Sequence, residues 1–179
     1  MSTHAFLLRA VNVGGTAKLP MAELRALAAE LGATDVATYI ASGNLLATPP
    51  GPPAEFAATL SGAIEQRYGF SREVIVRDAA ALRAALAEHP FTITDAARSF
   101  VAPLTATPDP AAIAAAAAVP AGDDAWAVIG DDLHVRYENG AGRAQLDLAR
   151  LLRTLGVAGT ARNLRTLETL IGMMEPSGS

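Results

Sequence analysis

The sequence contains no cysteine, which excludes a disulfide framework, a thiolate nucleophile and a cysteine-ligated zinc site. Aromatic residues are scarce at 5%, and Lys18 is the single lysine. No stretch of about 18 apolar residues runs without charges or helix breakers, as a membrane span would require. The first residues also lack the basic start and apolar segment of a signal peptide. We therefore expect a cytoplasmic protein that contacts no membrane.

The net charge and the histidines bear on two further classes of function, nucleic-acid binding and metal binding. The net charge of −4 excludes a globally basic nucleic-acid binder, although a local basic patch remains compatible with it. The three histidines, at positions 4, 89 and 134, have no metal-ligand spacing. We therefore expect no metal and no other cofactor. Hydrophobic residues make up 51% of the chain, which is ample for a core.

The first part of the chain predicts a ferredoxin-like subdomain over residues 1–90. Apolar runs and alternation predict strands over residues 4–10, 35–41, 45–48 and 72–77. Leucines at helical spacing follow Pro20, and Phe56, Leu60 and Ile64 mark a second helix. The resulting order is β-α-β-β-α-β, in which two helices pack on one face of a four-stranded antiparallel sheet.

Residues 91–179 predict a second, smaller α+β subdomain that ends in helices. Strands are expected over residues 99–104, 125–129 and 133–137, and an alanine-rich helix over residues 110–119. Leucines at positions 148, 151, 152 and 155 predict a strongly amphipathic helix, and a last helix begins at Leu164. The fold class is therefore α+β, with two subdomains.

Four sequence stretches occur together in an order that resembles one bacterial family. They are residues 8–15 (LRAVNVGG), 38–44 (TYIASGN), 76–77 (VR) and 160–163 (TARN). The chain is similar over nearly its whole length to the domain of unknown function 1697 family (DUF1697). The resemblance implies two α+β subdomains, the first ferredoxin-like, and brings no catalytic residue with it. The chain departs from the family pattern at four positions: Ala10, Ala144, Leu164 and Arg165.

The first candidate site follows the first strand. Gly14 and Gly15 precede a helix and can present backbone N–H groups to an anion. Arg9 can add a bidentate contact to phosphate or carboxylate, and Asn12 a polar contact. The alternative is a tight turn in which Arg9 pairs with a carboxylate.

Two further groups of small polar residues are candidate ligand contacts. Tyr39, Ser42, Gly43 and Asn44 lie at a hairpin tip, where the alternative is plain turn chemistry. Arg162 and Asn163 precede the last helix, where the alternative for Asn163 is an N-cap.

A cluster of arginines near the C-terminus favours a different partner. Residues 143–165 hold five arginines against one acid, Asp147, which gives a local charge of +4. At helical spacing Arg143, Arg150 and Arg153 share one face, which suits a phosphate-rich partner. The alternative is a solvated helix face. No aromatic residue lies between these arginines to stack on bases.

The leading hypothesis from the sequence is a protein that binds a small anionic ligand, bearing phosphate or carboxylate, at the strand-end loops. Two alternatives are a nucleic-acid-binding module that uses the arginine face and a non-catalytic assembly module. Either a monomer or a homodimer agrees with the pattern. Nothing in the sequence decides between an enzyme and a binding protein.

Overall fold

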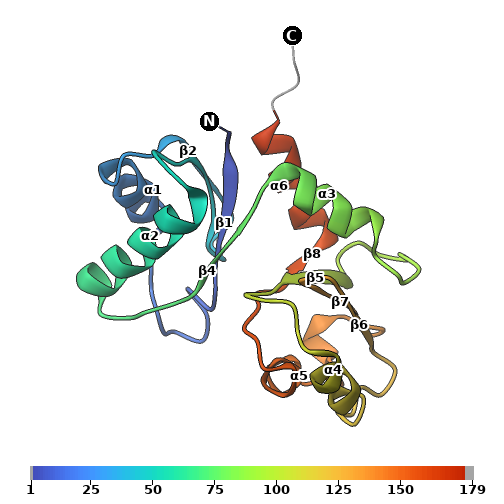
Figure 1. The fold of residues 1–179 in the computed structure, drawn as a ribbon. Helices are drawn as coiled ribbons and strands as arrows, with labels where there is room; N and C mark the ends of the chain where they lie inside the picture. Colours follow the sequence, from blue (N-terminus) through green and yellow to red (C-terminus); the bar gives the residue numbers. More distant parts are fainter. Residues whose placement is uncertain (1, 176–179) are drawn as a thin grey trace. The chain divides into compact units, whose positions relative to one another are not determined.

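The computed structural model describes residues 2–175, which divide into two compact units. The first unit comprises the chain up to Leu82 together with the residues from Thr169 onward, and the second comprises Arg83–Glu168. The division falls inside helix α3 (Ala79–Ala87) and inside helix α6 (Leu164–Met174), so each helix contributes to both units (Figure 1). The sequence pattern predicted a first subdomain over residues 1–90 and a second over residues 91–179 that includes the C-terminal helices.

The first unit has the predicted ferredoxin-like order. Its elements are β1 (His4–Leu8), α1 (Met21–Glu30), β2 (Thr34–Tyr39), β3 (Asn44–Thr48), α2 (Pro53–Tyr68) and β4 (Val74–Arg77). The strands form one antiparallel sheet in the order β2-β3-β1-β4. Helices α1 and α2 lie on one face of this sheet (Figure 1).

The core of the first unit lies between the sheet and these two helices. Alternate residues of β1, Phe6 and Leu8, pack with the leucines of α1 and with Phe56 and Leu60 of α2. The rings of Phe6 and Phe56 meet edge to face at a centroid distance of 5.1 Å. The central strand β1 is buried from Ala5 to Leu8, which explains its continuous apolar run.

The second unit contains a four-stranded antiparallel sheet. Its strands are β5 (Ser99–Pro103), β6 (Ala125–Ile129), β7 (Asp132–Arg136) and β8 (Arg162–Asn163), in the order β6-β7-β5-β8. Helices α4 (Pro110–Ala116) and α5 (Leu148–Leu155) pack together on one side, where Leu133 and Val135 of β7 join their core. The mixed α+β class predicted from the sequence is confirmed.

The other face of the second sheet carries polar side chains. The strand register places His134 opposite Val101 and Arg136 opposite Ser99, and Val101 is also opposite Arg162. Partners in an antiparallel ladder point to the same face, so these side chains share one surface. We call Ser99, His134, Arg136 and Arg162 the polar face of the second sheet. Arg136 is half-buried, and the other three are buried.

Two local predictions for this half were wrong. No strand was predicted between residue 137 and the last helix, but Arg162 and Asn163 form β8, because they pair with Val101 and Phe100 at the edge of the sheet. Arg143 was predicted to share a helix with Arg150, but it lies in a short 3-10 turn, η1 (Ala141–Arg143), and α5 begins only at Leu148. Within the described residues no helix has the length and apolar character needed to cross a membrane.

Candidate functional site

The loop after β1 is a small hairpin whose tip is the glycine pair. The N–H of Thr16 donates to the carbonyl of Val13 at 3.1 Å, and both Gly14 and Gly15 have positive φ, at 59° and 74°. Two central residues with positive φ are the requirement of a type I′ turn, which glycine meets without strain. The glycine pair is therefore required by this turn. It does not lie at the N-terminus of α1, which begins only at Met21.

Asn12 joins this loop to the turn between β2 and β3. Its side-chain amide donates to the carbonyls of Leu19, at 2.9 Å, and Ala41, at 2.7 Å. Its side-chain oxygen accepts from the N–H of Leu19 at 2.7 Å. One side chain thus holds three backbone groups from two loops that are far apart in sequence.

The turn between β2 and β3 is held by Asn44, which is fully buried. Its amide donates to the carbonyl of Tyr39 and to Oγ of Ser42, both at 3.0 Å. Gly43 belongs to this turn and packs against Leu8 and Val11, and its carbonyl accepts from the N–H of Leu8 at 2.9 Å. Tyr39, Ser42, Gly43 and Asn44 thus meet at one turn, and the ligand role predicted for them stays a prediction.

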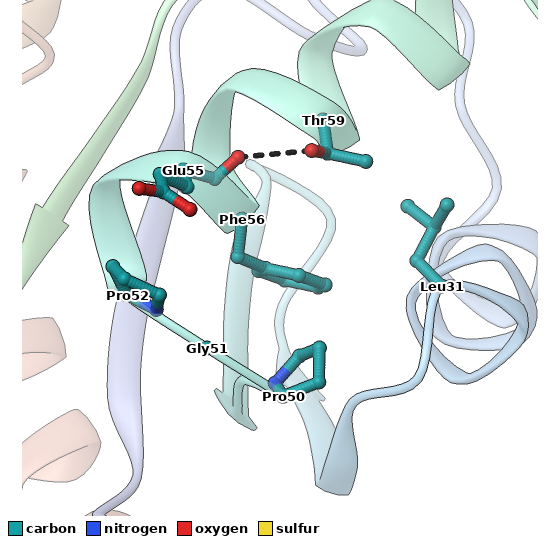
Figure 2. Close-up of a pocket in the computed structure, with 7 residues that line it drawn as sticks. All are labelled: Leu31, Pro50, Gly51, Pro52, Glu55, Phe56 and Thr59. Atoms are coloured by element: carbon teal, nitrogen blue, oxygen red, sulfur yellow. Dashed lines mark hydrogen bonds between the residues drawn. The ribbon is translucent and has the colours of Figure 1, made fainter.

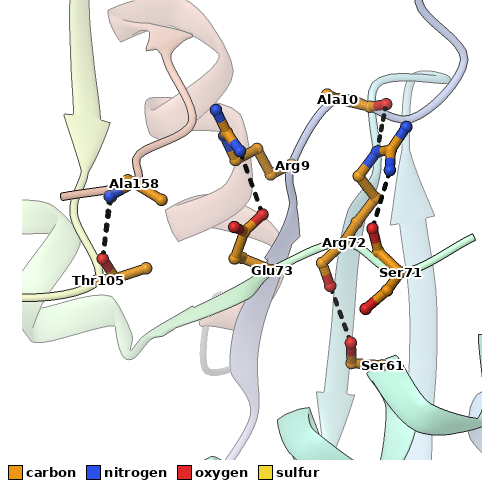
Figure 3. A network of polar contacts seen from close by, with 8 residues as sticks. All are labelled: Arg9, Ala10, Ser61, Ser71, Arg72, Glu73, Thr105 and Ala158. Carbon is orange, nitrogen blue, oxygen red and sulfur yellow. Dashed lines mark hydrogen bonds and ion pairs between the residues drawn. The ribbon is translucent and has the colours of Figure 1, made fainter. Parts of the chain in front are cut away.

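Two arginines flank the start of the β1–α1 loop, as Figure 3 shows. Arg9 pairs with Glu73 at 3.3 Å, and both side chains are well exposed, at 38% and 46%. Arg72 donates from Nε to the carbonyl of Ala10 at 3.4 Å, and its guanidinium lies 5.4 Å from the ring centre of Phe70. Both cations remain in reach of solvent beside the loop.

Arg162 and Asn163 belong to the second unit. Arg162 is buried, and its Nη1 donates to Oγ1 of Thr160 at 2.6 Å and to the carbonyl of Ala161 at 3.1 Å. Desolvation lowers the pKa of its guanidinium to about 10. Asn163 accepts from the N–H of Thr166 at 2.8 Å, so it caps α6. A ligand role for both residues stays a prediction.

The arginine face is smaller than predicted. Arg150 and Arg153 are exposed and lie three residues apart on α5, whereas Arg143 lies outside that helix. The N-terminus of α5 is capped by Asp147, whose carboxylate accepts from the N–H of Arg150 at 3.0 Å. The shared surface therefore holds two arginines with an acid one turn away.

One polar pair, His89 and His134, has no signature in the sequence. His89, which follows α3, and His134 of β7 bring their Nδ1 atoms within 3.0 Å of each other. Burial lowers the pKa of both imidazoles, and the neighbouring His89 adds to the shift of His134, whose pKa falls to about 4. The histidines are 45 residues apart, so only the tertiary fold reveals the pair.

A mostly apolar pocket lies beside the proline-rich segment between β3 and α2. It has a volume of about 150 Å³ and is lined by Leu31, Phe56 and the residues 50–52 (Figure 2). Its polar members are Glu55 and Thr59, and the hydroxyl of Thr59 already donates to the backbone carbonyl of Glu55 at 3.0 Å. It contains no cation, so it does not suit an anionic ligand.

The two antiparallel sheets with their helices define a two-unit α+β protein. The family described as protein of unknown function (DUF1697) matches residues 1–134, and the chain belongs to this family. The fold is similar to that of the conserved bacterial protein SP0830 from Streptococcus pneumoniae, with a TM-score of 0.77 and 24% identity. That match covers 97% of this chain and 99% of the other. Among curated proteins, none matches the chain.

Proposed function

We propose that the strand-end loops of the first unit bind a small anionic ligand that bears a phosphate or a carboxylate. The observation that carries the proposal is the clamp made by Asn12, which fixes the β1–α1 loop and the β2–β3 turn to each other. A preset loop surface binds a ligand without paying the entropy of ordering at that moment.

Backbone strain in these loops supports the same proposal. Four non-glycine residues there have positive φ: Ala10, Asn12, Ala17 and Ile40. Such conformations cost on the order of 1–3 kcal/mol each and persist only where the surroundings impose them. They concentrate at binding sites because a ligand needs a backbone shape that the chain would not adopt unaided.

Arg9 is the proposed anion contact. Its ion pair with Glu73 is exposed, and exposed pairs contribute about 0–1 kcal/mol. A phosphate or carboxylate that accepts two hydrogen bonds from the guanidinium binds more strongly than that. The exposed N–H groups of the Gly14–Gly15 turn and the hydroxyls of Tyr39 and Ser42 are proposed as polar contacts, whereas Asn12 and Asn44 position the loops.

Replacing Arg9 by alanine is expected to leave folding unchanged and to weaken ligand binding by about 10- to 100-fold, since a charge-assisted hydrogen bond contributes about 1.5–3 kcal/mol. A thermal-shift screen with nucleotides, sugar phosphates, dicarboxylates and coenzyme A esters would identify the ligand. A bound ligand at about 100 times its Kd stabilises the fold by roughly 2.7 kcal/mol. Titration of the hit into the wild type and Arg9→Ala then measures the loss.

Arg67→Ala is the matched control, because Arg67 also forms an exposed ion pair, with Glu30 at 2.7 Å, but on the helices α2 and α1. Full affinity in Arg9→Ala would overturn the proposal, as would a screen in which no small anion shifts the melting temperature.

Shifts by oligonucleotides alone, lost with added salt and in an Arg150→Ala, Arg153→Ala double variant, would favour the nucleic-acid alternative instead. A silent screen together with a dimer in light scattering would favour assembly.

Replacing Asn12 by alanine is expected to lower the free energy of unfolding by about 1–2 kcal/mol, because three hydrogen bonds of a partly exposed side chain are lost. Ligand affinity is expected to fall as well, since the two loops are no longer held together. Urea unfolding and hydrogen exchange over residues 11–19 measure both effects. Unchanged exchange in these residues would show that Asn12 is not the clamp.

A further inference from the structure

The histidine pair of the second unit joins the polar face to the segment that follows α3. His134 has no exposed surface, and His89 reaches it from the segment that joins α3 to β5. The ring centres are 5.2 Å apart, and the Nδ1 atoms are at hydrogen-bond distance. Phe91 follows on the same segment, packs edge to face on His89 at 5.6 Å and lies 5.9 Å below the guanidinium of Arg136.

The contact between the Nδ1 atoms is incompatible with protonation of both imidazoles. A hydrogen bond between them needs one Nδ1 that carries a hydrogen and one that does not. Two protonated imidazoles would both carry hydrogen on Nδ1, so the bond would break and two like charges would face each other. The Nε2 atoms of both rings are buried without a hydrogen-bond partner, so neither ring has a group there to stabilise an added charge.

The surroundings of the pair also favour the neutral form. Arg136 lies two residues along β7 on the same face, and its Nε is itself buried without a hydrogen-bond partner. The residues of β6 on this face are apolar. The charged side chains of the elements around the pair are Asp132 and Arg136 on β7, Arg162 on β8, Glu88, Asp95 and Arg98 on the connecting segment, Arg83 on α3, and Arg165 and Glu168 on α6.

We infer that residues 89–94 form an acid-released strap, which the hydrogen-bonded pair of His89 and His134 holds on the polar face and which opens when both imidazoles are protonated. The strap includes Ile93, whose side chain is 51% exposed, and the exposed Thr92 and Thr94. Its attachments to β7 are the histidine contact and the contact of Phe91 with Arg136.

The end of the segment is anchored independently, which makes the opening local. Asp95 accepts from the N–H of Ala97 at 2.8 Å, and the carbonyl of Arg98 accepts from the N–H of Tyr137 at 2.9 Å. These backbone bonds do not depend on histidine. Acid therefore releases residues 89–94 and leaves β5 paired with β7.

The pH dependence of strap opening follows from the difference in the pKa of His134 between the closed and the open state. The closed state holds the pKa of His134 at about 4, whereas an opened histidine returns to the ordinary value of about 6.5. The strap is therefore most stable above about pH 6.5 and loses stability as the pH falls toward 4. For His134 alone, the equilibrium constant for opening rises about 30-fold between pH 7.5 and pH 5.

Backbone ¹³Cα NMR spectra of the full chain at about pH 7.5 and about pH 5 test the inference. The shifts of residues 89–94 are expected to move toward random-coil values at the lower pH, while those of β5 change little. His89→Ala is expected to give the released shifts at both pH values. Its side chain is only half-buried, so the variant tests the strap without emptying the core.

His4→Gln is the matched control, because His4 lies in the first unit, where its Nδ1 bonds to the carbonyl of Ser2 and its ring lies 6.5 Å from that of Phe6. It is expected to keep the wild-type response to pH. Equal Cα chemical shifts of residues 89–94 at both pH values would overturn the inference. So would a rise in melting temperature with Zn²⁺ that His89→Ala abolishes, since the pair would then be a metal site.

Discussion

Replacing Asp124 by alanine is expected to lower the stability of the second unit by about 3–5 kcal/mol, because it leaves one buried and two partly buried backbone N–H groups without a partner. Asp124 is buried and accepts hydrogen bonds from the backbone N–H groups of Glu138, Gln145 and Leu146, at 3.0, 2.7 and 3.0 Å. It thereby fixes the chain that leaves β7 and the segment that leads into α5.

Urea unfolding followed by the fluorescence of Trp126, the single tryptophan, reports on this unit directly, since Trp126 lies on β6. Asp123→Ala is the matched control, because Asp123 is exposed and only its backbone N–H takes part in a hydrogen bond, to Gln145. Asp124→Asn keeps the shape and one acceptor oxygen, so an intermediate loss is expected. A loss in Asp124→Ala no larger than in Asp123→Ala would contradict this account.

Replacing Gly43 by alanine is expected to cost about 2–4 kcal/mol in the first unit, from overpacking together with backbone strain. Gly43 has φ of +88°, and an added Cβ would lie 2.6 Å from Cγ2 of Val11 and 2.9 Å from Cβ of Leu8. Those atoms belong to the β1–α1 side of the proposed ligand site. The variant should therefore also separate the two loops and weaken ligand binding.

Gly62→Ala is expected to stabilise the same unit that Gly43→Ala destabilises. Gly62 lies inside α2, and nothing lies within 4 Å of an added Cβ. Alanine is favoured over glycine in a helix by about 0.5–1 kcal/mol, so this variant should be more stable than the wild type. Thermal unfolding followed by circular dichroism compares the two variants. Equal stability of Gly43→Ala and the wild type would mean that the close packing of this turn is dispensable.

The first unit could be predicted from the sequence because its elements depend on local patterns. The apolar run of β1, the alternation in β2 and the leucines of α1 each indicate one element, and their order specifies the ferredoxin-like sheet. The same local reasoning identified Asn163 as a cap for α6. It also offered a turn with an ion-paired Arg9 as the alternative to an anion site, and both features are present.

The candidate site was harder to predict because its polar side chains act across long sequence distances. The sequence placed Asn12 and the residues 39–44 in separate loops, and it could not show that Asn12 bonds to Ala41. Nothing in the pattern singles out Asp124, whereas the fold gives this carboxylate three backbone donors. Residue type indicated polar loops, but the hydrogen-bond partners depend on how the strands align.

The sequence by itself determined the α+β class, the family resemblance and the position of nearly every strand and helix, since short-range periodicity encodes these features. Only the tertiary structure decided which residues meet. Strand β8 exists because Val101 and Phe100 offer a free edge, and His89 reaches His134 because the register of β7 turns that residue toward the polar face. Pairing between distant segments depends on register and packing, which no local pattern records.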